Sequence, residues 1–109
     1  MIARLWSART TTAQSTRYLE HFWQSVVPSL RKFDGYLSAS VLVRPHRDSV
    51  EILVITVWKS FEAIDAFAGA DRETAVVASE AAALLTHYDR HVRHYEVAQM
   101  DGLVFRQSE

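Results

Sequence analysis

The chain has 109 residues, which suits one domain with a single hydrophobic core. Hydrophobic residues make up 49% of it and the net charge is −1, which excludes a disordered chain and argues against nucleic acid or an anionic membrane surface as a partner. No cysteine is present, so disulfides, thiolate metal sites and cysteine nucleophiles are excluded.

The chain begins with a predicted strand followed by a predicted helix. Residues 2–9 are expected to form a strand that places Arg4 and Trp6 on the same face, because side chains in a strand alternate. Thr11-x-x-Gln14 is typical of a capping box and predicts a helix from about residue 12.

This helix is expected to be interrupted. Pro28 lacks a backbone donor and should kink or break it near residues 24–27, and Asp34-Gly35 should end it. Residues 36–44 and 50–58 then predict two strands joined by a turn.

The third predicted strand is apolar on both faces. Its two apolar sets are Leu53, Ile55 and Val57 on one face, and Ile52, Val54 and Trp58 on the other. Leu5, Val41 and Val43 add apolar surface on the neighbouring strands. Helices can cover only one face of such a sheet, so we expect a second copy of the chain to cover the other.

The second half of the chain predicts helices and a last strand. Ser60 is a plausible N-cap, and Gly69 should end the helix that follows. We expect a short helical piece within 71–77, a helix over 80–89 and a fourth strand over 92–97. The fold class is therefore α+β, with a ferredoxin-like βαββαβ order and helices on one face of an antiparallel sheet.

Four stretches of sequence resemble a known family. They are Met1-Ile-Ala-Arg-Leu-Trp6, Phe33-Asp-Gly-Tyr-Leu37, Ile55-Thr-Val-Trp-Lys-Ser60 and His94-Tyr-Glu-Val97. Their order and spacing resemble the antibiotic biosynthesis monooxygenase family of the dimeric α+β barrels, over a domain that we place at residues 1–99. The resemblance implies a homodimer that pairs through its sheet faces and a pocket between sheet and helices in each protomer. Some members oxygenate aromatic polyketide-like compounds without a cofactor, and others degrade haem.

The haem-degrading branch can be compared position by position. The resemblance assigns an asparagine, a tryptophan and an iron-binding histidine to the positions held here by Trp6, Phe67 and Val77. A valine cannot bind iron, so we expect no haem degradation, no cofactor and no metal.

Arg4 is the first candidate for chemistry. The resemblance puts Trp6, and with it Arg4, on the pocket side of the first strand. A guanidinium placed there needs a partner. It is expected either to form a structural ion pair with Glu96 or a helix acid, or to hold a carboxylate or phenolate of a substrate.

His94 is the candidate general base, because a neutral imidazole titrates near the working pH. The alternative is a structural histidine at a strand–helix contact. His87 and His91 would complete a metal-binding face on one continuous helix, but the strand pattern at 92–97 interrupts it. For substrate binding we select the aromatic residues Trp6, Trp58, Phe67 and Tyr88, each of which has an alternative reading as core.

Three functions remain open from the sequence. The first is cofactor-independent oxygenation of an aromatic polyketide-like or other small apolar molecule, and the second is a non-catalytic binding or structural barrel. The third is a related enzyme, such as an isomerase or cyclase, that uses the same base and pocket. An open cavity of several hundred Å³ would favour the first, and a pocket filled by aromatic side chains the second.

No signal peptide or membrane span is evident, so we expect a cytoplasmic protein. The tail, residues 100–109, contains Leu103-Val104-Phe105, which would clasp a partner subunit or remain disordered.

Overall fold

A computed structural model of the protein describes residues 1–101. In chain order the elements are β1 (Ile2–Thr11), α1 (Thr12–His21), the π-helical turn η1 (Phe22–Val26), α2 (Val27–Leu30), β2 (Tyr36–His46), β3 (Ser49–Trp58), α3 (Phe61–Ala68), α4 (Ser79–Ala82), β4 (His87–Tyr88) and β5 (Arg93–Glu96).

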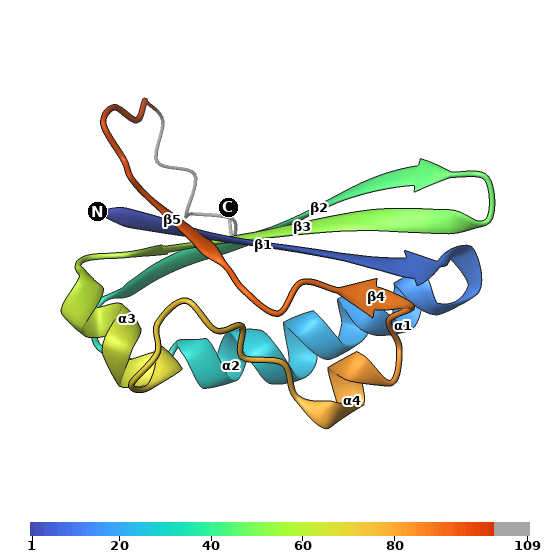
Figure 1. The fold of residues 1–109 in the computed structure, drawn as a ribbon, viewed down its shortest axis with the longest axis horizontal. Coiled ribbons are helices and arrows are strands. Elements are labelled where there is room, and N and C mark those ends of the chain that lie inside the picture. The colour runs from blue at the N-terminus through green and yellow to red at the C-terminus, as the bar shows by residue number, and fades with distance from the viewer. Residues whose placement is uncertain (102–109) are drawn as a thin grey trace.

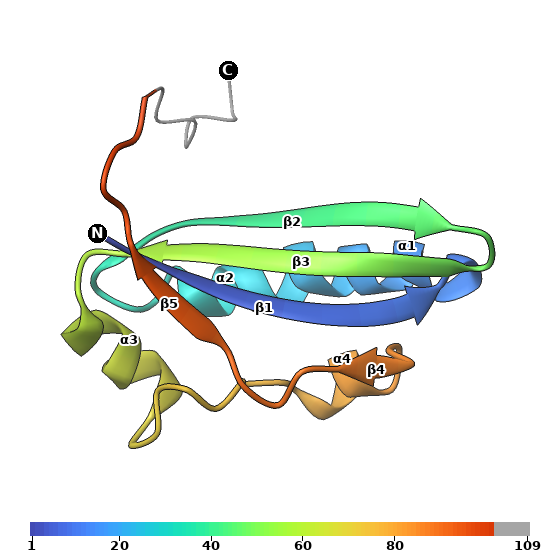
Figure 2. The same cartoon turned by 45° about the horizontal axis from the view of Figure 1, so that its top comes forward.

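The strands form one antiparallel sheet in the order β2-β3-β1, and both β4 and β5 pair with the remaining edge of β1 (Figure 2). This is the ferredoxin-like order, and the predicted α+β fold class is confirmed. The strand predicted over 92–97 is β5, which pairs near the start of β1, and β4 is an additional short strand that pairs near the end of β1.

All the helices lie on one face of the sheet, and the opposite face is left open (Figure 1). Side chains of β3 alternate between the two faces, and Ile52 and Trp58 on the helical side are almost completely buried, as are Leu30 and Ile64 from the helices. The core therefore lies in a single layer between sheet and helices.

Local signals explain where the helices begin and end. The Thr11 side chain accepts a hydrogen bond from the Gln14 backbone N–H, and Ser60 does the same for Ala63. Gly69 ends α3 with a φ of +87°, a conformation that favours glycine. The expected break at Pro28 takes the form of a π-helical turn just before it. The helix then continues as α2 to Leu30.

Two predicted helices are wrong. Residues 71–77 form turns and extended backbone, in which Thr74 bridges to His91. The helix expected over 80–89 ends at Ala82, and His87 and Tyr88 lie in β4. This stretch instead pairs with the edge of β1. The Thr86 N–H donates to the Arg9 carbonyl at 2.8 Å, and the Asp89 N–H donates to the Ser7 carbonyl at 3.0 Å.

The register decides which apolar residues face the open side. Leu42 lies opposite Leu53, and Leu5 lies opposite Ile55, so these four share the open face with Val57. The expectation that Val41 and Val43 add to this face is wrong, because they pair with Val54 and Ile52 of the covered side. A one-residue difference in register moves a side chain to the other face.

No helix within residues 1–101 is long and apolar enough to cross a membrane. The tail residues Leu103, Val104 and Phe105 lie outside the described residues, and the boundary at residue 99 stays a prediction.

Candidate functional site

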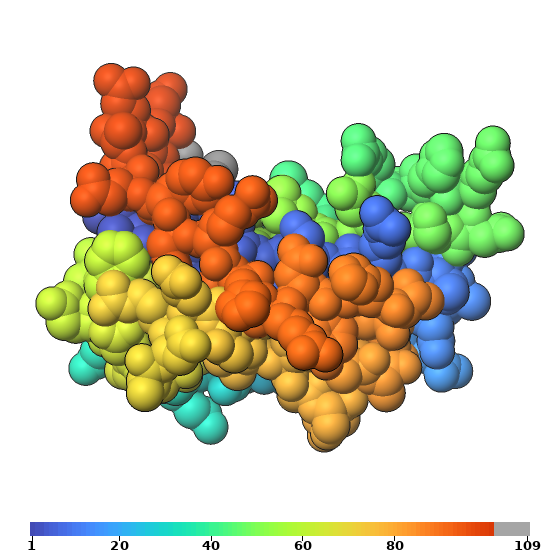
Figure 3. Space-filling view, in the orientation of Figure 1, coloured from blue at the N-terminus to red at the C-terminus, as the bar shows by residue number. Residues whose placement is uncertain are grey.

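A cavity of about 90 Å³ lies between the helical face of the sheet and the helices. Its walls come from β1, β3, the α1–η1–α2 helix, Phe67 of α3, and the extended segment 75–78. The lining residues are Arg4, Trp6, Tyr18, Phe22, Val26, Leu30, Val54, Thr56, Phe67, Ala75, Val76, Val77, Ala78, Ala81 and Val92. In Figure 3 the stretches coloured yellow and orange lie against each other on the face turned to the viewer.

One helix wall of the cavity repeats every four residues, through Tyr18, Phe22, Val26 and Leu30. In a regular α-helix four residues exceed one turn, so such a stripe would drift steadily around the axis. The π-helical turn η1 has more residues per turn and offsets that drift. The local widening of the helix therefore keeps four side chains facing one cavity.

Arg4 supplies the positive charge of the cavity wall. Its side chain donates to the Arg72 carbonyl at 2.5 Å, to the Thr74 carbonyl at 3.1 Å, and contacts the Nε2 atom of His94 at 3.0 Å. It is only 5% exposed and lies over the Phe67 ring at 5.6 Å. Burial lowers the pKa of Arg4 to about 10, so the group is desolvated yet still charged at neutral pH.

No carboxylate pairs with Arg4 among residues 1–101. The expected ion pair with Glu96 is not formed, because Glu96 lies opposite Ile2, two residues along the strand. The nearby acid Asp65 is engaged by Arg72, with two hydrogen bonds of 2.8 Å. Arg4 is therefore stabilised only by uncharged acceptors, the two carbonyls and His94, which leaves its charge available to an anion in the cavity.

His94 stands behind Arg4, on β5 opposite it in the register, and is not among the cavity-lining residues. Arg4 has no acceptor atom, so the neutral His94 ring must accept its hydrogen bond at Nε2 and carry its own proton on Nδ1. Burial, followed by the charges of Arg4 and Arg72, lowers the pKa of His94, and Glu73 and Asp65 oppose this shift. A role as general base stays a prediction, and it requires the Arg4 contact to open first.

The lowered pKa of His94 predicts a stability that depends on pH. A histidine whose folded-state pKa is depressed contributes stability that is complete above the free value of about 6.5 and is lost as the pH falls toward the folded value. Glutamine can accept from Arg4 without titrating. As the pH falls below about 6.5, we therefore expect the melting temperature of the native protein to fall more steeply than that of a His94→Gln variant, measured by thermal unfolding. Parallel curves would show that His94 does not titrate against Arg4.

The four aromatic residues selected for substrate binding take different places. Trp6 and Phe67 line the cavity, whereas Trp58 and Tyr88 do not. Trp58 is fully buried beneath Phe67, with ring centroids 5.3 Å apart, and donates to Thr56 at 2.9 Å. Tyr88 packs behind Trp6 at 6.1 Å.

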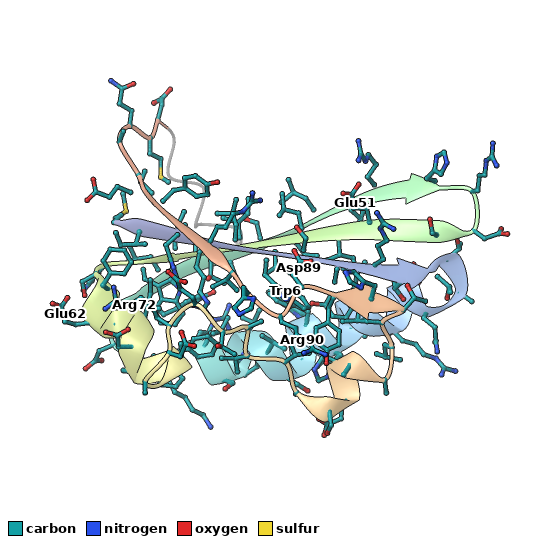
Figure 4. All side chains as sticks on the ribbon, in the orientation of Figure 1. Trp6, Glu51, Glu62, Arg72, Asp89 and Arg90 are labelled. Atoms are coloured by element: carbon teal, nitrogen blue, oxygen red, sulfur yellow. The ribbon has the colours of Figure 1, made fainter. Side chains whose placement is uncertain are left out.

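Trp6 is held by the strand that replaced the expected helix. Its indole N–H donates to the Asp89 carbonyl at 2.7 Å, and the two residues lie together where β5 approaches β4 in Figure 4. Trp6 therefore forms a fixed side wall of the cavity.

Tyr18 and Thr56 are polar lining residues that sequence reasoning missed. Thr56 is the polar member of an apolar strand, and Tyr18 fits the pattern of an ordinary core position. The spacing of Tyr18 from Phe22 was the available signal, since it continues the apolar stripe of the helix by one turn.

The described residues contain no group of three histidine or acidic side chains suited to a metal ion. His87 lies in β4, His91 bridges to Thr74, and His94 lies in β5, so the three histidines share no helix face. Val77 lines the cavity, and the lining within residues 1–101 contains no histidine, cysteine or methionine. This donor set does not fit haem iron through the usual nitrogen or sulfur ligands.

Sequence comparison relates the chain to one protein family. The sequence profile of a family described as antibiotic biosynthesis monooxygenase matches residues 1–79. No curated protein matches the chain in sequence.

Solved structures share the fold over nearly the whole chain. A Bacillus cereus protein assigned to the antibiotic biosynthesis monooxygenases matches with a TM-score of 0.67 at 20% identity, covering 94% of this chain and 96% of its own. The haem degrader MhuD from Mycobacterium tuberculosis, solved with two haems in its active site, matches at 0.60 and 21%, covering 94% and 100%. A protein from Deinococcus radiodurans, assigned like the first, matches at 0.59 and 12%, covering 94% and 98%. At these identities the likeness concerns the fold.

Proposed function

Since the chain belongs to the antibiotic biosynthesis monooxygenase family, we propose that it binds a small aromatic molecule in the cavity beside Arg4 and oxygenates it without a cofactor. The observation that carries the proposal is a buried guanidinium with no carboxylate partner in residues 1–101, on the wall of a mostly apolar cavity. Such a group stabilises an anion that develops during a reaction, because water and competing charges are excluded.

The proposed reaction starts with a substrate CH₂ group next to a phenol or ketone. A base removes one proton, and Arg4 stabilises the oxygen of the resulting enolate or phenolate. His94 is our candidate for this base, and it can reach the substrate only after its contact with Arg4 opens. The electron-rich carbon then reduces O₂ and forms a hydroperoxide, which loses water to leave a new carbonyl. One atom of O₂ ends in the product and one in water, so the substrate supplies all four electrons.

Oxygen uptake with a set of anthrone-like and quinol-like compounds tests this proposal. Turnover under ¹⁸O₂ should give a product with one labelled oxygen and two fewer hydrogens than the substrate, with no added metal or flavin. Binding of these compounds without oxygen uptake would contradict the oxygenase and favour the second candidate.

The second candidate is a non-catalytic small-molecule-binding barrel, and the size of the cavity favours it. About 90 Å³ is below the roughly 300 Å³ at which ligand pockets usually begin. Oxygenation of a large ligand would require the segment 75–78, which has no helix or strand, to move outward.

We also propose that two copies pair through the open sheet face. Leu5, Leu42, Leu53 and Ile55 all point to this side and remain partly or largely exposed. A contiguous apolar sheet face of this kind typically marks an interface, and an isologous contact would cover it on both protomers at once.

A haemin titration tests whether this protein binds and degrades haem as the structurally similar haem degrader does. We expect no spectrum of histidine-ligated haem and no loss of haem absorbance with a reductant, because Val77 stands where the resemblance assigns the ligand. A Val77→His variant is the matched comparison. Saturable haem binding by the native protein, followed by degradation, would contradict this expectation.

A further inference from the structure

The Tyr18 side chain is a buried donor for which the described residues offer no partner. Tyr18 is 3% exposed and lines the cavity. Within residues 1–101 its hydroxyl makes no hydrogen bond, and the side-chain polar atom that is fully enclosed without a partner is His21 Nε2. The Tyr18 hydroxyl therefore still reaches accessible space. Burial raises the pKa of Tyr18 to about 12, so the phenol remains neutral and can donate a proton in a hydrogen bond at any working pH.

Tyr18 and Arg4 lie toward opposite ends of the cavity. Tyr18 belongs to the core cluster that contains Ala8 and Ile52. Arg4 lies over Phe67, which packs in the other cluster with Trp58. Four residues of β1, or about 13 Å of strand, separate Arg4 from Ala8. Two long side chains that reach inward from such positions leave room between them for a molecule about one aromatic ring long.

The two groups require different atoms from a ligand. A guanidinium without a carboxylate partner prefers an anionic oxygen. A neutral phenol donates one hydrogen bond, which an uncharged acceptor such as a carbonyl or nitro oxygen can take. The other lining side chains are mostly apolar and include Phe22, Val54 and Val77.

From this arrangement we infer that Tyr18 determines specificity: the cavity selects a flat monoanion with its acidic oxygen at Arg4 and an uncharged oxygen acceptor at the opposite end, at Tyr18. This rests on the proposed function, because it takes Arg4 as the anion site. It goes further by naming the second recognition group and the shape of the ligand. Compounds that carry the anionic oxygen but no second oxygen acceptor bind at Arg4 and gain no affinity from Tyr18.

Two phenolate probes test the inference, at a pH where both are ionised. 4-Nitrophenolate carries an oxygen acceptor opposite its anionic oxygen, and pentafluorophenolate does not. Affinities are measured by calorimetry for the native protein and for Tyr18→Phe, which removes only the hydroxyl. We expect Tyr18→Phe to weaken 4-nitrophenolate about tenfold, the value of one net hydrogen bond, and to leave pentafluorophenolate unchanged.

A matched control is Tyr36→Phe, because Tyr36 packs against Trp58 at 5.6 Å outside the lining. It should change neither affinity. The melting temperature of Tyr18→Phe should equal that of the native protein, since no internal hydrogen bond is removed.

The outcomes separate the two proposals. Equal changes for both probes in Tyr18→Phe, or no change for either, would overturn the role of Tyr18 while the anion site stands. Failure of both probes to bind the native protein would overturn the anion site itself and this inference with it.

Discussion

Arg4→Met is expected to lower the rate of oxygen uptake on a true substrate by about 10²-fold or more. Methionine keeps much of the length of the side chain and its contact with Phe67 but removes the charge. Loss of one preorganised group that stabilises a developing anion typically costs roughly 10²–10³ in rate. Affinity for a phenolate probe should fall with it, by about 10- to 100-fold, because a charge-assisted hydrogen bond contributes about 1.5–3 kcal/mol.

Two further variants make the Arg4 result interpretable. Arg17→Met removes an exposed arginine from α1, next to Tyr18, and should change neither rate nor affinity. Arg4→Lys retains the charge but cannot serve both the Arg72 and Thr74 carbonyls in the same geometry, so an intermediate loss is expected together with a lower melting temperature. An Arg4→Met protein that is folded and fully active would remove Arg4 from the mechanism.

Ile55→Lys is expected to convert the proposed dimer into a monomer. Ile55 lies in the middle of the open sheet face, opposite Leu5 on one side and Ser40 on the other. A lysine there would be buried without a partner, at a cost of several kcal/mol, and the two-fold symmetry would repeat that cost in each protomer. Light scattering at micromolar concentration should show the mass change from two chains to one.

A comparable substitution on the helical side provides the control. Leu19 lies in α1 and is 39% exposed, so Leu19→Lys should leave the mass unchanged. A native protein that is well folded and has the mass of a single chain would refute the pairing of sheet faces and require another explanation for the exposed Leu42 and Leu53.

Local signals predicted much of the first two thirds of the chain. The caps at Thr11 and Ser60 and the ends of β3 depend on interactions within a few residues, and all were predicted to within one or two positions. The ferredoxin-like order followed from these elements, because short connections and antiparallel pairing leave few alternatives.

Residues 71–89 escaped the same reasoning. Their alanines and acidic residues favour helix locally, yet the chain from Leu84 to Asp89 runs along β1. There Thr10 donates to the Leu84 carbonyl at 2.6 Å, and backbone bonds to Arg9 and Ser7 follow. The edge of β1 offers backbone hydrogen-bond partners, and a helix propensity calculated from neighbouring residues takes no account of them. Pairing these backbone groups stabilises the strand by more than the weak local preference for helix.

The candidate site divides in the same way. Arg4, Trp6 and Phe67 were selected from sequence, and all three line the cavity; Tyr18 was missed because a tyrosine at a helical core spacing is usually only packed. The catalytic role of His94, like the cytoplasmic location, stays a prediction.

The amino-acid sequence by itself determined the order of strands and helices, their caps and the third strand that is apolar on both faces. These features depend on alternation, capping and burial, which act between residues close together in the chain. Only the tertiary structure determines that Arg4 has carbonyl partners and no acidic partner among residues 1–101, and that His94 stands behind it. It also determines that a π-helical turn aligns Tyr18 with the cavity. Those features arise from groups 68 to 90 residues apart, or from a small change in helix winding. Their positions follow from register and packing, which no local pattern records.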